Sequence, residues 1–225
     1  MTESELREQM VNTVRGWIGK NEADGTHTSI IDLYNCITPL PVGYKVQYTD
    51  SWCATTPSAA AYVCQLTDIV FPECSCQRMI DLYKRANRWV EDDAYVPIPG
   101  DLIFYGWSDS GVGDYVGPPD HVGLIEECDG TYITVLEGNL HDAVGRRRIA
   151  VNSRYIRGYG VPDYASKATI QLFPDVQETA WYAEAVNWAK ANGIVVGRDD
   201  GLFHPNDNVT RAECVAMLYR ARKGS

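Results

Sequence analysis

The sequence has little positive charge and no long apolar run. Twenty Lys and Arg stand against thirty Asp and Glu, which gives a formal net charge of −10 and argues against nucleic acid as the main partner, because phosphate binding needs a basic surface. No stretch is apolar enough to span a bilayer, and residues 1–8 lack the basic and apolar parts of a secretory signal. We therefore expect no nucleic-acid partner, no membrane partner, and synthesis in the cytoplasm without a signal peptide.

The sequence also lacks a cysteine framework. Its seven Cys are an odd number, and without an export signal they are expected to be reduced thiols rather than disulfides. Cys74 and Cys76 are spaced as a metal-binding pair, but no second Cys/His pair at zinc-like spacing accompanies them. We predict no metal and no cofactor.

Apolar periodicity predicts an α+β fold. Helices are expected at 6–18, 30–36 and 77–89, with a further helix after Cys53, and strands at 102–105, 120–125, 131–136, 146–151 and 155–159. Helices followed by hairpin-connected strands are typical of the α+β class. The Gly/Asp/Ser-rich segment 108–119 is expected to be a surface loop near a functional rim.

The composition changes near the C-terminus. Residues 1–162 are predicted to be the main domain, 163–170 a linker and 171–225 a small helical module. In this module a helix is expected at 181–192, and Thr210 with Glu213 forms a capping box that opens a last helix.

Three residues predict a thiol-based site in the main domain. Cys53 follows Asp50 and precedes an alanine-rich run, so it is expected in the first turn of a helix, where backbone N–H groups stabilise a thiolate. His121 begins a predicted strand and Glu137 follows the end of another. Because the ends of elements converge on one edge of a sheet, the three are candidates for nucleophile, base and base-orienting group. The alternative is a buried structural Cys with two ordinary surface residues.

Four segments surround or accompany these residues: Ser51-Trp52-Cys53-Ala54, Pro99-Gly100-Asp101-Leu102-Ile103-Phe104, Asp120-His121-Val122-Gly123 and Glu137-Gly138-Asn139. At these segments the main domain resembles the CHAP family, the cysteine, histidine-dependent amidohydrolases/peptidases, which are papain-like peptidoglycan hydrolases common in phage lysins. The resemblance implies Cys53 as nucleophile, His121 as base and then acid, Glu137 as its orienting group and Asn139 as a secondary polar support. The backbone N–H of Cys53 would contribute to the oxyanion hole.

Two departures from the family pattern stand out. Many relatives continue with Phe-Val after Trp-Cys-Ala, whereas this chain has Thr55-Thr56-Pro57, and a Pro beyond the first turn would break the helix. Some relatives carry an Asp-rich calcium loop before the Cys, whereas residues 44–50 contain one carboxylate, too few for calcium.

The C-terminal module contains Phe173-Pro174-Asp175-Val176, then Trp181, and later Thr210-Arg211-Ala212-Glu213. In these segments it resembles one S-layer homology repeat. The resemblance implies that Arg211, with Trp181 and Asp175, binds anionic cell-wall polysaccharide. Relatives usually pack three repeats together, so we expect three identical chains to associate and cover Trp181, Trp188, Val195 and Leu218; packing against the chain's own main domain is the alternative.

Together these features predict a modular peptidoglycan hydrolase of the endolysin type. The expected reaction is cleavage of an amide bond, by either an N-acetylmuramoyl-L-alanine amidase or an endopeptidase, at the bacterial wall after lysis or holin-type release. Two alternatives stay open: a wall-binding protein whose catalytic residues have drifted, and an NlpC-type thiol peptidase acting on small wall peptides.

Overall fold

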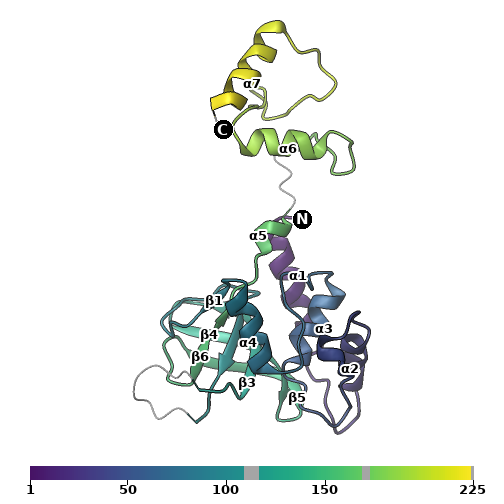
Figure 1. Cartoon of the computed structure of the whole chain (residues 1–225), viewed down its shortest axis with the longest axis vertical. Helices are drawn as coiled ribbons and strands as arrows, with labels where there is room; N and C mark the ends of the chain where they lie inside the picture. Colours follow the sequence, from purple (N-terminus) through teal and green to yellow (C-terminus); the bar gives the residue numbers. More distant parts are fainter. Residues whose placement is uncertain (109–116, 169–172, 224–225) are drawn as a thin grey trace. The chain divides into compact units, whose positions relative to one another are not determined.

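A computed structural model describes residues 1–108, 117–168 and 173–223. Its contacts divide the chain into two compact units: Ser4–Lys167, and Ala168–Ser225 together with Met1–Glu3. The larger unit begins with helices and continues with strands, as expected for an α+β fold (Figure 1). Its helical part comprises α1 (Glu3–Arg15), α2 (Thr28–Asn35), the 3-10 turn η1 (Pro41–Gly43), α3 (Thr55–Val63), α4 (Cys76–Arg85) and α5 (Tyr164–Lys167).

The strands form one antiparallel sheet of six strands in the order β1-β6-β2-β3-β4-β5. All four residues of the central strand β2 are buried, because it has neighbours on both edges and packing on both faces. One face carries a cluster of fully buried side chains: Ile103, Tyr105, Ile125, Ile133, Val135, Ile156 and Tyr159. The strands are β1 (Trp89–Val90), β2 (Leu102–Tyr105), β3 (His121–Cys128), β4 (Tyr132–Leu140), β5 (Ala143–Ala150) and β6 (Ile156–Gly160).

Several predicted boundaries differ from the structure, and two of the differences change the placement of a residue within its element. The helix expected at 77–89 ends at Arg85, because Asn87 adopts a positive φ of 54° that terminates the helical turn, and Trp89 begins β1 instead. Glu137 does not follow the end of its strand but lies within β4, which continues to Leu140 through an irregularity in its pairing with β5. The expected loop 108–119 lies mostly outside the described residues.

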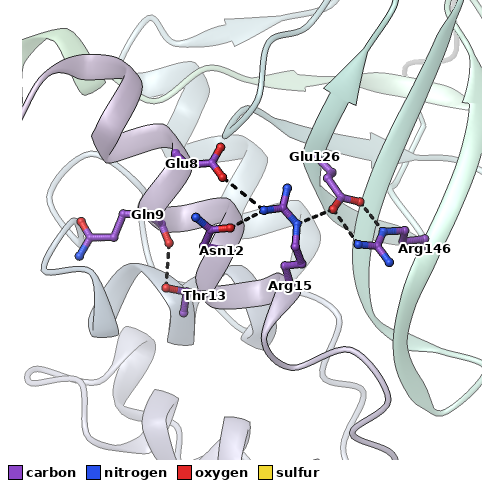
Figure 2. Close-up of polar contacts among 7 residues, drawn as sticks. All are labelled: Glu8, Gln9, Asn12, Thr13, Arg15, Glu126 and Arg146. Atoms are coloured by element: carbon purple, nitrogen blue, oxygen red, sulfur yellow. Dashed lines mark hydrogen bonds and ion pairs between the residues drawn. The ribbon is translucent and has the colours of Figure 1, made fainter.

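Charged side chains attach α1 to the sheet. Arg15 of α1 donates from Nε to Oε1 of Glu126 on β3 over 2.7 Å, and Arg146 of β5 donates to both carboxylate oxygens over 2.5 and 2.9 Å. Figure 2 shows both arginines directed at this carboxylate. These contacts lower the pKa of Glu126, with Arg146 as the largest cause. One carboxylate therefore joins a helix and two strands.

The Pro-Gly-Asp segment has a structural role. Asp101 is fully buried and accepts hydrogen bonds from Arg7 Nη1 at 3.0 Å, Tyr95 Oη at 2.9 Å and the backbone N–H of Ile98 at 3.1 Å. Arg7 belongs to α1 and donates also to the carbonyl of Pro99 at 3.0 Å. Asp101 thus fixes the entry to β2 against the first helix.

The smaller unit contains α6 (Ala183–Ala191) and α7 (Arg211–Lys223) around a short apolar core. The capping box is confirmed: the backbone N–H of Thr210 donates to Glu213 Oε2 at 2.7 Å and that of Glu213 to Thr210 Oγ1 at 3.2 Å. Within the described part of the chain, no helix is long and apolar enough to cross a membrane. The core consists of Phe173, Val176, Ala183, Val186, Ile194 and Val195.

The larger unit extends into the residues expected to form the linker. Tyr164, in the expected linker 163–170, is fully buried and donates from its hydroxyl to the carbonyl of Gly100 over 2.9 Å. Arg7 lies over its ring at 4.5 Å. Residues up to Lys167 therefore belong to the larger unit.

Candidate active site

Cys53 lies in the turn that leads into α3. The helix begins at Thr55, but the backbone N–H of Thr56 already donates to the carbonyl of Trp52 over 3.1 Å, so Cys53 is inside the first helically bonded turn. Pro57 is the third residue of α3, and the first N–H groups of a helix have no partner within it, so the missing N–H of Pro57 removes no bond from α3 itself. Thr55-Thr56-Pro57, which stands where many relatives have Phe-Val, is therefore compatible with a thiol at the start of a helix.

The residue before the thiol is firmly held. Trp52 is fully buried, donates from Nε1 to Glu22 Oε1 over 2.9 Å and lies 5.7 Å from the ring of His27, centre to centre. Both ring nitrogens of His27 face backbone carbonyls, those of Asn21 at 3.2 Å and Tyr48 at 3.0 Å. His27 therefore supports the loop before α2 and is not part of the thiol site.

His121 and Glu137 meet across neighbouring strands. His121 begins β3, and its Nε2 lies 3.0 Å from Oε2 of Glu137, whose side chain is fully buried on β4. The absence of a side chain at Gly123 makes room for this carboxylate, because a Cβ there would stand 2.8 Å from Glu137 Cγ. With Nε2 bonded to the carboxylate, Nδ1 is the ring nitrogen left for the thiol.

A glycine brings β4 close to the start of α3. A Cβ at Gly138 would collide with the side chain of Thr56 and would lie 3.0 Å from the ring of Trp52. Because Gly138 follows Glu137, this close approach places the carboxylate strand beside the turn that carries Cys53. Glu137 thus serves the chemistry of the site, and Gly138 beside it allows the close approach of β4 to the start of α3.

The thiol and the imidazole stabilise each other's charged forms. The pKa of Cys53 is well below the ordinary thiol value, first because of a hydrogen bond from Cys76 and then because of His121 and the backbone N–H of Ala54, while burial opposes the shift. Burial lowers the pKa of His121, but hydrogen bonds to Cys53 and Glu137 outweigh it and raise that pKa to about 9. This is the charge distribution of a thiolate–imidazolium pair.

Arg147 is a site residue that the sequence analysis missed. Its Nε donates to Glu137 Oε1 over 2.7 Å, opposite the oxygen that faces His121. Burial raises the pKa of Glu137, but hydrogen bonds from His121 and Arg147 outweigh it and lower the pKa below its usual value. The two cations therefore keep a fully buried carboxylate ionised.

Aromatic rings line the same edge. The rings of Tyr105 and Trp107 stack 4.7 Å apart, and they lie 6.0 and 6.4 Å from the ring of His121. The guanidinium of Arg147 is 4.9 Å from the Trp107 ring centre. Trp107 is 39% exposed, so it presents a flat apolar surface to solvent beside the imidazole.

Asn139 is not brought into this arrangement. It lies on β4 two residues after Glu137, but its φ of 56° and the irregular pairing there interrupt the alternation that would place both side chains on one face. Within the described residues, its side chain makes no hydrogen bond to Cys53, His121 or Glu137. The role of polar support is therefore given by Arg147 in this structure.

The three residues predicted for polysaccharide binding are not in mutual contact in the described chain. Asp175 accepts from the backbone N–H groups of Phe203 at 2.9 Å and His204 at 2.6 Å, and these bonds lower its pKa, with Phe203 as the largest cause. Its carboxylate is therefore occupied in holding a loop. Trp181 is 93% exposed, and Arg211 is exposed at the start of α7.

A cavity of about 790 Å³ lies in the same unit, between the segment 195–209 and α7. Two cations that the sequence analysis did not single out line it. Arg198 pairs with Glu213 at 3.3 Å, and Arg220 donates to the carbonyl of Ile194 at 3.1 Å. Arg211 is not among its lining residues.

The larger unit thus belongs to the class of α+β domains with a Cys–His–Glu site formed by a helix start and two adjacent strands. Residues 43–139 match the sequence model of the CHAP domain, and residues 172–214 match that of the S-layer homology domain. The chain therefore contains a CHAP domain followed by an S-layer homology domain, as the motifs predicted.

Curated relatives resemble the chain over short segments. An S-layer protein of Bacillus thuringiensis subsp. finitimus is 39% identical over 46 residues, which is 20% of this chain and 6% of that protein. The outer membrane protein SlpA of Thermus thermophilus is 42% identical over 48 residues, 21% of this chain and 5% of its own length. The middle cell wall protein of Brevibacillus brevis is 39% identical over 67 residues, 29% of this chain and 6% of that protein. No solved structure matches the chain significantly.

Proposed function

We propose that the chain is a cysteine-dependent peptidoglycan hydrolase that cleaves an amide bond of the bacterial cell wall. The observation that carries the proposal is the 3.0 Å contact of His121 with the buried Glu137, next to a helix-start thiol whose pKa is lowered partly by that imidazole. A CHAP domain that retains these residues favours catalysis over a drifted binding protein.

The proposed reaction has two halves, formation of a thioester on Cys53 and its hydrolysis, and His121 transfers one proton in each half. The Cys53 thiolate attacks the amide carbonyl carbon, and the backbone N–H of Cys53 donates to the oxyanion. The C–N bond then breaks, and the His121 imidazolium gives its proton to the leaving amine. In the second half neutral His121 takes a proton from water, whose oxygen attacks the thioester and releases the carboxylic acid and the thiolate.

The supporting residues position the base and favour its charged form. Glu137 holds the ring of His121 through Nε2, and Arg147 holds Glu137 from the other side. A buried carboxylate that stays ionised stabilises the imidazolium when it forms. The exposed ring of Trp107, beside His121, offers a surface against which sugar or peptide atoms of the wall can pack.

Digestion of purified walls tests the proposal. Wild-type protein should clear the walls, Cys53→Ala should not, and the exposed Cys36→Ala should match wild type as a control for loss of a thiol. Mass spectrometry of the new termini would separate an N-acetylmuramoyl-L-alanine amidase from an endopeptidase. Wall binding without clearing by wild type would favour the drifted binding protein, and hydrolysis confined to soluble stem peptides would favour the NlpC-type alternative.

We further propose that the S-layer homology domain holds the enzyme on anionic wall polysaccharide through Arg211 and Trp181, and that three chains associate through this domain. Both side chains are exposed, and a cation at a helix N-terminus suits an anionic sugar. Release to the wall through lysis or a holin, and the phage origin that this implies, belong to the same proposal. Retention of Arg211→Ala on wall pellets as strong as that of wild type would contradict the binding role.

A further inference from the structure

A second thiol lies next to the proposed nucleophile. The sulfur of Cys76 is 3.7 Å from that of Cys53, although the two residues are 23 positions apart in the sequence. Cys76 is the first residue of α4, directly after the helix cap Ser75, whereas Cys53 lies in the turn before α3. The fold therefore brings two helix starts, each with a thiol, to one place, and the reaction described above uses only one of them.

The distance suits a reversible bond between the two sulfurs. A disulfide requires about 2.05 Å between sulfur atoms, so the two sulfurs need to move closer by less than about 2 Å. Both are free in the structure, and Cys76 is only partly buried, so a small oxidant has a route to the pair. Cys53 is 8% exposed and is not sealed off either.

We propose that Cys53 and Cys76 form an oxidative modification site, at which a peroxide oxidises Cys53 and Cys76 captures the product as a disulfide. The loss of wall hydrolysis that should follow rests on the proposed function, but the disulfide itself does not. The modification would protect the nucleophile, because a disulfide is reduced by thiols whereas sulfinic and sulfonic acids are not.

Two steps account for all atoms and electrons. The Cys53 thiolate attacks one peroxide oxygen, the O–O bond breaks, an S–O bond forms and hydroxide leaves, so sulfur loses two electrons and the peroxide gains them. The Cys76 sulfur then attacks the sulfenic sulfur of Cys53; the S–O bond breaks and the hydroxyl leaves with the Cys76 proton as water. A dithiol reductant restores both thiols.

The electrostatics of the pair assign the two roles. The pKa of Cys53 is lowered, which makes it the thiol that reacts, as its thiolate, with the peroxide. The pKa of Cys76 is raised, first by its hydrogen bond to the Cys53 thiolate and then by burial. Oxidation of Cys53 removes that negative charge, and the backbone N–H groups at the start of α4 then favour the Cys76 thiolate that completes the disulfide.

Cys74 provides a matched control in the same segment. Its sulfur accepts from Arg78 Nη2 at 3.5 Å, and its backbone N–H donates to Glu73 at 2.8 Å. Arg78 also pairs with Glu73 at 2.8 Å. These contacts hold Cys74 beside Glu73, so its removal should not affect the disulfide between Cys53 and Cys76.

The test treats the full chain with hydrogen peroxide, blocks remaining thiols and identifies cross-linked peptides by mass spectrometry. Wild type and Cys74→Ser should lose about 2 Da and give a linked Cys53–Cys76 peptide. Both should lose wall hydrolysis and recover most of it with dithiothreitol. After the same two treatments, Cys76→Ser should recover less than about a tenth of the wall hydrolysis that it shows untreated. Without Cys76, the oxidised Cys53 proceeds to sulfinic acid, which dithiothreitol does not reduce.

The possible results test the modification site separately from the proposed wall hydrolysis. Absence of the Cys53–Cys76 peptide, or full recovery of Cys76→Ser, would overturn the modification site. A linked peptide in a protein that never digests walls would support the modification site and overturn the proposed function instead.

Discussion

The guanidinium of Arg147 donates from Nε to Oε1 of Glu137 over 2.7 Å, while the other oxygen of that carboxylate faces His121. Glu137 pairs with Gly145 across β4 and β5, so Arg147 is its diagonal neighbour, two residues along β5. This relationship makes Arg147 a positioning residue that acts on the base through the carboxylate.

Arg147→Ala should therefore lower kcat/KM for wall digestion by about tenfold to a hundredfold, because a misplaced base costs rate without removing the nucleophile. Arg148→Ala is the matched control: Arg148 is adjacent and exposed, and its guanidinium lies over Tyr132 at 3.6 Å instead of contacting Glu137. It should retain nearly full activity. Equal losses in both variants would indicate a general effect of charge on wall attraction and would remove Arg147 from the site.

The thiol should be reactive at low pH. Because Cys76 and His121 lower the pKa of Cys53, iodoacetamide should alkylate it well below the pH at which an ordinary thiol, with a pKa of about 8.5, becomes reactive. His121→Ala should move this reactivity back to higher pH. Peptide mapping of the alkylation rates at several pH values measures this, with the exposed Cys214 as internal reference. Cys53 reacting no faster than Cys214 in mildly acidic buffer would contradict the assignment.

Glu137 should set the alkaline end of the pH profile. The imidazolium of His121 is needed to protonate the leaving amine, so activity should fall as pH rises through its pKa of about 9. The carboxylate helps to raise that pKa, so Glu137→Gln should shift the alkaline limb to lower pH. It should also cut kcat by about 10³-fold while leaving measurable turnover.

The pH profile of kcat/KM in both proteins checks this, with Cys53→Ala as the zero-activity control. An unshifted alkaline limb in Glu137→Gln, or wild-type activity, would show that Glu137 does not act on His121.

The sequence predicts those candidate site residues that lie in recognisable local contexts. Cys53 precedes a helix and His121 begins a strand, and both contexts can be read from neighbouring residues alone. Arg147 and Cys76 join the site only through strand register and the meeting of two helix starts. Such relationships depend on tertiary packing, which no local pattern encodes.

The differences between the predicted and the observed arrangement have the same origin. Asn139 was expected beside Glu137 from a motif, but its positive φ depends on irregular strand pairing that the motif does not specify. The helix expected to include Trp89 stopped early because Asn87 adopts a left-handed conformation, which Asn tolerates better than most residues. Trp89 then pairs with Gly160 in the sheet.

The space beside Gly138 should be essential. Any side chain there would meet Thr56 and Trp52, so Gly138→Ala should separate β4 from the start of α3. We expect a loss of about 1–3 kcal/mol in the free energy of unfolding and a larger proportional loss of wall hydrolysis. Gly16→Ala is the control, because a Cβ there would approach nothing closer than 3.4 Å. Urea denaturation and wall turbidity measure the two effects; a Gly138→Ala protein as stable and active as wild type would refute the steric argument.

The S-layer homology domain should associate into trimers. Its own core buries Val195, but it leaves Trp181 at 93%, Trp188 at 60% and Leu218 at 67% exposed. We expect closed threefold association to cover these exposed side chains and to bring three Arg211 side chains together for avidity. Light scattering should give three times the chain mass for the full protein and a monomer for residues 1–167, which end where the larger unit ends.

Leu218→Lys should dissociate the trimer and weaken retention on wall pellets without changing hydrolysis of soluble wall fragments. A full-length monomer at micromolar concentration would reject the trimer and favour packing of this domain on its own chain.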